Sequence, residues 1–370
     1  MGKRSASRSI FARATLAVVL CLSLLAFSGQ ASAQSGGAQP FVRVCGTQLC
    51  LPGLHGLQPF VVHGGTAYGQ YDDPVREIAL AKRAHVNVIE LVEFDTRFHI
   101  LSDTMSSATW TRVDRFLAVA RAAGMHVILH FAEYGQSLAA AGVTPTTVDW
   151  KSYLSFVANR VNTVTGIRYK DDPTIAMVEL YGEIDAPNFG VPTAGTTAEM
   201  TAFFHRTLTE WHALAPHILA STGGFSYINY PSSGIDWQTI VSDPADDVCG
   251  VEVNATPDRD VSVPAMSSLC QKLGKPWFLS AWSSCYADKG FDGDIDHWSS
   301  DTEMAAHAVD MEQVAADLHP AGAAPSMPSI GSDFWNLGDT PVIKGTCDIG
   351  PQFRLTLRAV QQAGSVAPPR

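Results

Sequence analysis

Short apolar runs alternate with amphipathic segments along almost the whole chain, and this alternation most restricts the possible folds. Eight runs have the length of a buried strand: PFVVHG, VNVIELVEF, MHVILHF, TIAMVEL, HILAST, DVCGVEVN, PWFLSAW and SIGSDFW. Helical patterns separate them, including residues 74–85, 109–124, 148–164, 197–214 and 301–318. Apolar strands that alternate with helices predict a parallel sheet covered on its outer face. Eight such units in roughly 300 residues predict the α/β class and a single (β/α)8 barrel, with a doubly wound open sheet as the alternative.

The first 33 residues have the features of a signal peptide. They open with four basic residues, Lys3, Arg4, Arg8 and Arg13. The apolar run ATLAVVLCLSLLAF follows, and ASA at residues 31–33 offers a cleavage site. This run is shorter than the ~20 residues of a membrane span, so an anchor is the weaker alternative. We expect a secreted protein with a flexible lead at residues 34–40, one barrel domain at 41–363 and a loose tail at 364–370.

The net charge restricts the classes of binding partner, and the number of cysteines predicts disulfides. Loss of the first 33 residues would change the formal net charge from −11 to −15, because they hold four basic and no acidic residues. An acidic surface argues against nucleic acid and anionic membranes. Six cysteines would remain, and an even number in an exported chain predicts disulfides. Of the fifteen possible connectivities, we expect Cys45–Cys50, Cys249–Cys270 and Cys285–Cys347.

The sequence contains no strong motif for a metal or a cofactor. No C-x-x-C pair occurs, so we expect no zinc site. Residues 292–303 place acids at positions 1, 3, 5 and 12 of a calcium-type loop, but His297 stands where the sharp turn needs glycine. We therefore expect neither metal nor cofactor, and a monomer.

Polar side chains gather where the predicted strands end, the edge at which (β/α)8 barrels bind their ligands. Carboxylates are frequent there and aromatic residues lie among them. The residues are His63, Glu93, Asp95, His130, Glu133, Glu183, Glu252, Asn254, Ser280, Trp282, Asp333 and Trp335. Such a mixture suits a sugar, because apolar ring faces stack on aromatic side chains while hydroxyls hydrogen bond to acids and amides. The predicted ligand is a carbohydrate.

Four stretches carry a resemblance to a known family. They are FVRVCGTQLCLPGLHGLQPFVVHGGTAYG, AKRAHVNVIELVEFD, YKDDPTIAMVEL and GSDFWNLGD. The first resembles the floor hairpin and first barrel strand of family 5 endo-β-mannanases and their relatives in glycoside hydrolase clan A. The third matches their fourth strand, where the family usually reads YKDDPTIMAWELANE. The resemblance covers nearly the whole mature chain and implies a secreted glycosidase acting on a β-linked, mannan-like polysaccharide or oligosaccharide.

The resemblance assigns two residues and breaks at four positions. The family's catalytic acid/base falls on Glu183, and its aromatic platform on Trp335. The family's Asn that binds the sugar 2-hydroxyl is replaced by Gly182 in this chain, and its Arg that supports the nucleophile is replaced by Glu90. The family's His-x-Tyr motif on the sixth strand is replaced by Glu252-x-Asn254. The seventh strand places Ser280 or Ala281 where the nucleophilic Glu belongs.

These departures change the predicted chemistry. A retaining glycosidase needs two carboxyl groups ~5–5.5 Å apart, and an inverting one ~6.5–9.5 Å with a water between them. Glu90 puts a negative charge where the family has the positive charge of an Arg. Carboxylates that point inward without a cation beside them raise one another's pKa, so one of them tends to keep its proton, as a general acid must. We expect Glu183 to be that acid and Glu252 to activate a water, which would make the enzyme inverting. A buried polar pair of Glu252 with Glu90 or Asn254 is the alternative.

Other residues are predicted to bind the sugar. Trp335, Trp282 and Tyr181 would stack on sugar rings, with core packing as the alternative. His130, Glu133, Asn254 and Glu90 would line the cleft, with hydrogen bonds to loops or a buried core histidine as the alternative. Glu179, on the same inward face as Glu183, is expected to be structural. The alternative function is a catalytically silent carbohydrate-binding barrel.

Overall fold

The structure is a computed structural model. It describes residues 39–68, 73–83, 85–92, 107–182, 197–225, 235–253, 258–282, 285–286, 297–298, 306, 311 and 329–334. All of these residues belong to one compact unit, which begins at Gln39. The predicted signal peptide, the C-terminal tail and the predicted helix at 301–318, apart from residues 306 and 311, lie outside the described residues.

A parallel sheet is the centre of the described chain, in the order β8-β7-β6-β5-β4-β14-β11-β10-β9. Its strands are β4 (Val62–Tyr68), β5 (Val88–Val92), β6 (His126–His130), β7 (Ile175–Glu179), β8 (Leu219–Ser221), β9 (Gly224–Phe225), β10 (Cys249–Val253), β11 (Trp277–Trp282) and β14 (Gly331–Phe334). The two ends of the order, β8 and β9, are separated by Thr222 and Gly223 alone. They are two halves of one interrupted strand, so the sheet closes on itself and the predicted eight-stranded barrel is confirmed.

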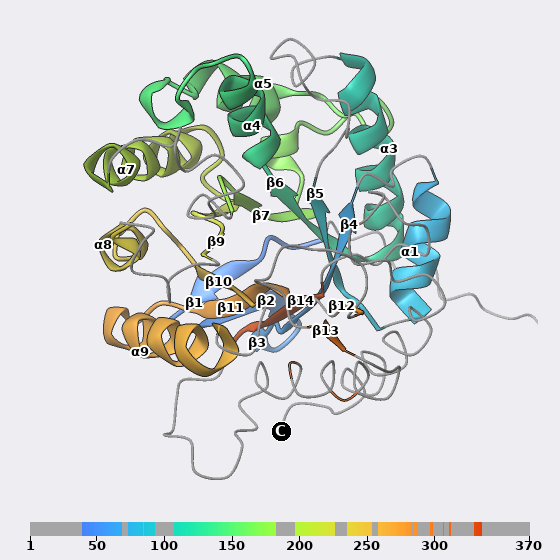
Figure 1. The fold of residues 1–370 in the computed structure, drawn as a ribbon. Coiled ribbons are helices and arrows are strands. Elements are labelled where there is room, and N and C mark those ends of the chain that lie inside the picture. Colours follow the sequence, from blue (N-terminus) through green and yellow to red (C-terminus); the bar gives the residue numbers. More distant parts are fainter. Residues whose placement is uncertain are drawn as a thin grey trace, which may run out of the picture. The chain divides into compact units, whose positions relative to one another are not determined.

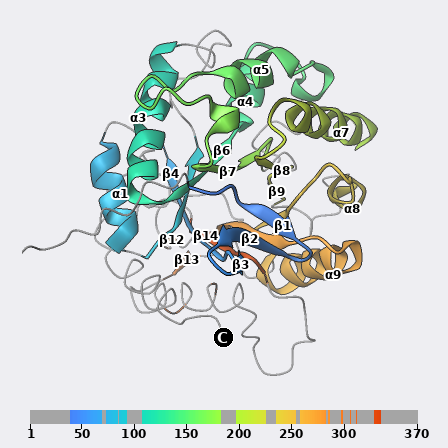
Figure 2. The ribbon, with the colours of Figure 1, turned by 180° about the vertical axis from the view of Figure 1, so that it is seen from behind.

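Helices lie around the outer side of these strands (Figures 1 and 2). They are α1 (Pro74–Arg83), α3 (Ser107–Ala123), α4 (Ala132–Ala140), α5 (Lys151–Asn159), α7 (Thr197–Leu214), α8 (Trp237–Val241) and α9 (Val263–Leu273). In α7, the spacing of Met200, Phe203, Phe204, Leu208 and Trp211 puts five large side chains on one buried face. None of the described helices has the length and hydropathy of a membrane span.

Two predicted boundaries were wrong. The helix expected at residues 148–164 is shorter, because Arg160 leaves helical geometry and Val161 pairs with Arg168 in a β-bridge. The first barrel strand begins at Val62 and runs to Tyr68, so His63 lies near its start rather than at its end. The preceding Pro59 belongs to a separate hairpin.

A small antiparallel sheet precedes the barrel, as predicted. It consists of β1 (Arg43–Cys45), β2 (Gln48–Gly53) and β3 (Gly56–Pro59). Cys45 and Cys50 form the expected disulfide between β1 and β2. Val42 and Leu49 pack into the same apolar cluster as the inward residues at the starts of the barrel strands. The hairpin therefore closes the N-terminal end of the barrel.

The barrel interior is built in two layers. The lower layer is apolar and comes from the strand starts: Val62, Val88, Ile128, Met177, Leu219, Val248, Phe278 and Ile330. The residue that follows each inward position in β5, β6, β7 and β11 packs outward, in the larger cluster that includes the helices. Strand alternation brings the next inward position to the C-terminal end of the barrel. There the side chains are polar.

The interruption between β8 and β9 is supported from the loop before β10. The Oδ1 atom of Asp246 accepts the backbone N–H of Thr222 at 3.1 Å, and Asp247 accepts that of Ala220 at 2.9 Å. Burial raises the pKa of Asp246 well above its usual range, although Lys275 opposes that effect. Gly223 has a φ of +93°, a conformation that favours glycine.

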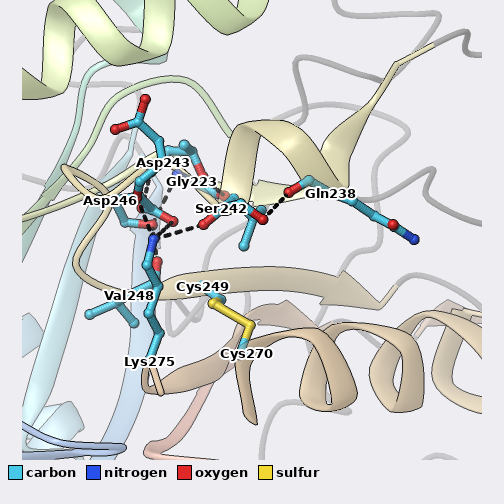
Figure 3. Close-up of a disulfide and its surroundings, with 12 residues drawn as sticks. Gly223, Gln238, Ser242, Asp243, Asp246, Val248, Cys249, Cys270 and Lys275 are labelled. Carbon is cyan, nitrogen blue, oxygen red and sulfur yellow. Dashed lines mark hydrogen bonds and ion pairs between the residues drawn. A yellow bond between two sulfur atoms is a disulfide. The ribbon is translucent and has the colours of Figure 1, made fainter. Parts of the chain in front are cut away.

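The same region carries a second disulfide (Figure 3). Cys249 at the start of β10 is joined to Cys270 on α9, as the sequence predicted. Lys275, just beyond α9, donates to the carbonyls of Val241 and Asp243 near the end of α8. The disulfide and Lys275 thus fasten α8, α9 and β10 together behind the β8–β9 interruption.

Candidate functional site

Eight polar side chains form a layer at the C-terminal end of the barrel interior, one from each of the eight barrel strands. We call them the polar layer: Thr66, Glu90, His130, Glu179, Ser221, Glu252, Ser280 and Ser332. Each lies two residues after an apolar inward residue, or four where a glycine stands between. All are buried, and none is more than 8% exposed. Buried carboxylates are costly without a function or a partner, so this layer is the candidate site.

Glu90, His130 and Glu179 lie together on the adjacent strands β5, β6 and β7. A carboxylate oxygen from each glutamate and one ring nitrogen of His130 all lie within 4.8 Å of one another. The hydroxyl of Thr66 on β4 donates to Oε2 of Glu90 at 3.1 Å. Glu90 and His130, both predicted to line the cleft, therefore share one group with Glu179.

His130 is held as a neutral imidazole. Burial lowers its pKa to about 4. Its Nε2 accepts the backbone N–H of Gly182 at 3.1 Å, so the ring proton resides on Nδ1. Three such ligands could surround a cation by distance alone. In this arrangement, however, His130 offers a metal no free lone pair, because Nε2 is engaged and Nδ1 is protonated.

Two glycines make the space that Glu252 occupies. A side chain at Gly182 would place its Cβ 2.6 Å from Nε2 of His130 and 3.1 Å from Oε1 of Glu252. One at Gly224 would place its Cβ 2.3 Å from Cγ and 2.6 Å from Oε1 of Glu252. Real Cβ contacts are essentially never shorter than 3.0 Å. The Glu252 side chain therefore lies in a cradle that requires glycine at position 224 and leaves little room for a Cβ at position 182.

Gly182 itself is closed in from a third side. A Cβ at Gly223 would lie 2.5 Å from the nitrogen and 2.7 Å from the Cα of Gly182. The Asn that the mannanase pattern has at position 182 cannot be placed without moving His130 or Glu252. Gly182 is thus required by the side chains of the polar layer.

Ser280 lies on β11 at a break in strand register. Val251 of β10 pairs with Leu279, and the next residue, Glu252, pairs with Ala281, so Ser280 is the extra residue of a bulge. Its side chain is 2% exposed. A Cβ at Gly224 would lie 2.1 Å from its Oγ, so Ser280 borders the same cradle as Glu252. Ser280, one of the two residues predicted to stand where the family has its nucleophilic Glu, therefore points into the barrel.

Glu133 is not at a strand end, contrary to the prediction. It lies in the first turn of α4 and is 3% exposed. Burial first, and then the charge of Glu133, raise the pKa values of Tyr153 and Tyr181. The strand MHVILHF ends at His130 and the helix begins at Ala132, a boundary that the apolar pattern alone did not reveal.

Tyr181 and Trp282 have the surroundings of core residues. Tyr181 is 3% exposed; its ring lies 6.0 Å from that of Trp150, and a Cβ at Gly135 would lie 1.8 Å from a ring carbon. Trp282 has no exposed surface. Stacking on a sugar needs an exposed ring face, so core packing accounts for both residues in this structure.

Several predicted residues lie outside the described parts of the chain. They are Glu93, Asp95, Glu183, Asn254, Trp335, Cys347, and residues 292–303 apart from 297–298. Cys285 belongs to the two-residue strand β12 (Cys285–Tyr286), which pairs with β13 (His297–Trp298).

Sequence reasoning missed part of the polar layer. Thr66, Ser221 and Ser332 were not singled out, and neither was the cradle glycine Gly224. The available signal was the register of each strand, counted from its apolar inward residue. It could have located all three hydroxyl residues, but not the glycine, whose role depends on residues from other strands.

No family model matches the chain. A curated relative, mannan endo-1,4-beta-mannosidase 3 of Oryza sativa subsp. japonica, is 24% identical over 239 residues, which cover 59% of this chain and 49% of the relative. The match thus spans about half the length of that protein.

Solved structures show the same fold at low identity. An endo-1,4-beta-mannanase from Rhizomucor miehei superposes with a TM-score of 0.63 at 19% identity, covering 88% of this chain and 99% of that one. An endo-beta-1,4-mannanase from Thermotoga petrophila gives a TM-score of 0.61 at 17% identity, covering 84% and 78%. A glycoside hydrolase family 5 mannosidase from R. miehei gives 0.59 at 13% identity, covering 89% and 98%. The predicted resemblance is confirmed: the chain is a divergent, mannanase-like (β/α)8 barrel.

Proposed function

We propose that the protein is a secreted, divergent glycoside hydrolase that cleaves O-glycosidic bonds in a β-linked, mannan-like polysaccharide or oligosaccharide. The likeness to mannanases in sequence and fold supports the substrate class. The basic and apolar features of residues 1–33 support export. The protein acts as a monomer on carbohydrate alone.

The observation that carries the proposal is the position of the Glu252 carboxylate. Its Oε1 lies 3.1 Å from the Cβ position of Gly182, and Glu183 follows Gly182 directly in the chain. Hydrolysis with two carboxyl groups needs a general acid and a second carboxylate near it. In the mannanase pattern the second carboxylate comes from the seventh strand. Here Glu252, on the neighbouring strand β10, supplies it.

The reaction then follows from the roles of these two acids. Glu183 donates its proton to the glycosidic oxygen as the bond from the anomeric carbon breaks. Glu252 accepts a proton from a water, whose oxygen bonds to the anomeric carbon from the opposite face. The product has the inverted configuration. Neutral His130 holds the Gly182 peptide through its Nε2 atom while this occurs.

The test is a comparison of matched glutamate-to-glutamine variants. The mature chain is screened on plant and microbial glycans, and Glu183→Gln and Glu252→Gln are assayed on the best substrate. Each should lose activity by roughly 10²–10⁴-fold, the usual contribution of general acid–base catalysis. Glu199→Gln, on an exposed position of α7, is the control and should keep wild-type activity. Unchanged hydrolysis in Glu183→Gln would reject the assignment.

One observation favours a second candidate function. The strand β11 reads WFLSAW and carries no carboxylate. A barrel that has lost its seventh-strand acid could bind carbohydrate without cleaving it. Saturable glycan binding by the wild type, with no product after long incubation, would establish this silent carbohydrate-binding barrel.

A further inference from the structure

Ser280 is a buried hydroxyl whose Oγ has no hydrogen-bond partner among the described residues, although the side chain is only 2% exposed. A buried hydroxyl left unpaired destabilises the folded state. Such atoms in native proteins commonly bind an ordered water. Strand alternation after Phe278 points this serine inward, and the register shift between β10 and β11 lies at the same residue, a feature that recurs beside active sites.

The space next to Ser280 is shared with Glu252. The Cβ position of Gly224 lies 2.1 Å from the Ser280 Oγ and 2.6 Å from the Glu252 Oε1. These distances put the two oxygens less than about 5 Å apart, so a single water, which spans about 2.7–2.8 Å to each partner, can reach both. A Cβ at position 224 would collide with both side chains. Glycine at this position therefore lets the two side chains come close to each other.

We propose that Ser280 and Glu252 together hold the attacking water of an inverting glycosidase, which makes Ser280 a further catalytic residue. This inference rests on the proposed function. One O–H of the water donates to the Glu252 carboxylate and the other to the Ser280 Oγ, so a lone pair of the water oxygen remains for the anomeric carbon. As the new C–O bond forms, Glu252 takes the first proton. The glycosidic bond breaks, and its oxygen takes the proton of Glu183.

This assignment explains why a serine can replace a nucleophile. A glutamate on β11 would itself bond to the sugar and leave no room for a water. A serine is shorter, and it offers an acceptor oxygen without competing with Glu252 for the proton. The carboxylate has in effect moved from β11 to β10, and a water stands where the nucleophile would have been.

The first experiment is kinetic. Ser280→Ala removes only the Oγ atom, and Ser267→Ala on α9 is the matched control, because that serine is also fully buried but lies outside the polar layer. Ser280→Ala should lower kcat by about tenfold to a hundredfold, the effect of one lost hydrogen bond in the transition state, with little change in KM. Ser267→Ala should leave kcat unchanged. NMR of the first product should show the α-anomer from a β-linked substrate.

The second experiment does not depend on turnover. A high-resolution crystal structure of the mature wild type should show one ordered water within about 3.2 Å of both the Ser280 Oγ and the Glu252 Oε1. The structure of Ser280→Ala should lack it or show it displaced. An active wild type with unchanged kcat in Ser280→Ala, or with no such water in its crystal structure, overturns the inference alone. A retained anomeric configuration overturns it together with the water-activating role of Glu252. A wild type that cleaves no glycan overturns it together with the proposed function.

Discussion

Two buried polar clusters in this protein differ in how fully their atoms are paired. Asp114 on α3 is completely engaged: Arg160 donates to it from Nε at 2.9 Å and from Nη2 at 2.6 Å, and Tyr169 donates its hydroxyl at 2.7 Å. Thr163 adds its backbone N–H and its hydroxyl. In the polar layer, by contrast, the Ser280 Oγ and the His130 Nδ1 have no partner within the described chain.

The difference separates structure from function. Burial by itself would raise the pKa of Asp114, but hydrogen bonds from Arg160, Tyr169 and Thr163 hold it below its usual value. A cluster of this kind ties α3 to the segment after α5, and no acceptor of the carboxylate is left for a ligand. A cluster with unpaired buried atoms at the C-terminal end of a barrel is where a ligand or an ordered water belongs.

The largest expected effect on stability is that of breaking the paired cluster. Asp114→Ala leaves the Arg160 side chain, which is 9% exposed, without its carboxylate. Removal of one partner from a buried ion pair costs about 3–5 kcal/mol of unfolding free energy. Urea unfolding should show this loss, while activity per folded molecule stays at the wild-type level.

The control for that variant is Asp171→Ala, at an exposed carboxylate of the same chain region. It should change the unfolding free energy by no more than about 0.5 kcal/mol. If Asp114→Ala instead abolished hydrolysis and left stability intact, the division between a structural cluster and a functional layer would be wrong.

Acidification should lower the free energy of unfolding through the two histidines of β6. Burial lowers the pKa values of His126 and His130 to about 4, against about 6.5 in an unfolded chain. Between pH 6.5 and pH 4 the unfolded state binds more protons than the folded state. The free energy of unfolding is therefore unaffected by these histidines above pH 6.5 and falls as the pH is lowered toward 4. At 1.36 kcal/mol per pKa unit, each histidine accounts for up to about 3 kcal/mol.

The measurement is urea unfolding at pH 7 and at pH 4.5, for the wild type and for His126→Asn. The variant should lose less stability between the two pH values, because one titrating group has been removed. Equal losses in both proteins would show that His126 is already charged in the folded state.

The smallest effect is expected from filling the cradle of Glu252. Gly182→Ala places a Cβ 2.6 Å from the His130 Nε2, and overpacking of this kind costs about 1–3 kcal/mol. The cost should fall when His130→Ala is introduced as well, because the clashing ring is then absent. Thermal unfolding of the two single variants and the double variant measures this coupling. Strictly additive effects would mean that Gly182 and His130 do not compete for space.

Much of the fold was predictable because it depends on local pattern. Each apolar run became a barrel strand, since a strand covered by helices on one side and filled by side chains on the other must be apolar on both faces. The disulfides Cys45–Cys50 and Cys249–Cys270 were also predicted correctly. The error at Glu133 arose because the step from β6 into α4 leaves no room for a loop signal.

The sequence by itself determined the barrel, its floor hairpin and the carboxylates at its C-terminal end, because those features follow from the periods of strands and helices. Only the tertiary structure decided why residue 182 is glycine. His130, Gly223 and Glu252 come from three other strand segments, and their approach to Gly182 is set by how the barrel closes. The closeness of Ser280 to Glu252 likewise depends on the register between β10 and β11, a relation between two strands that neither strand's sequence contains.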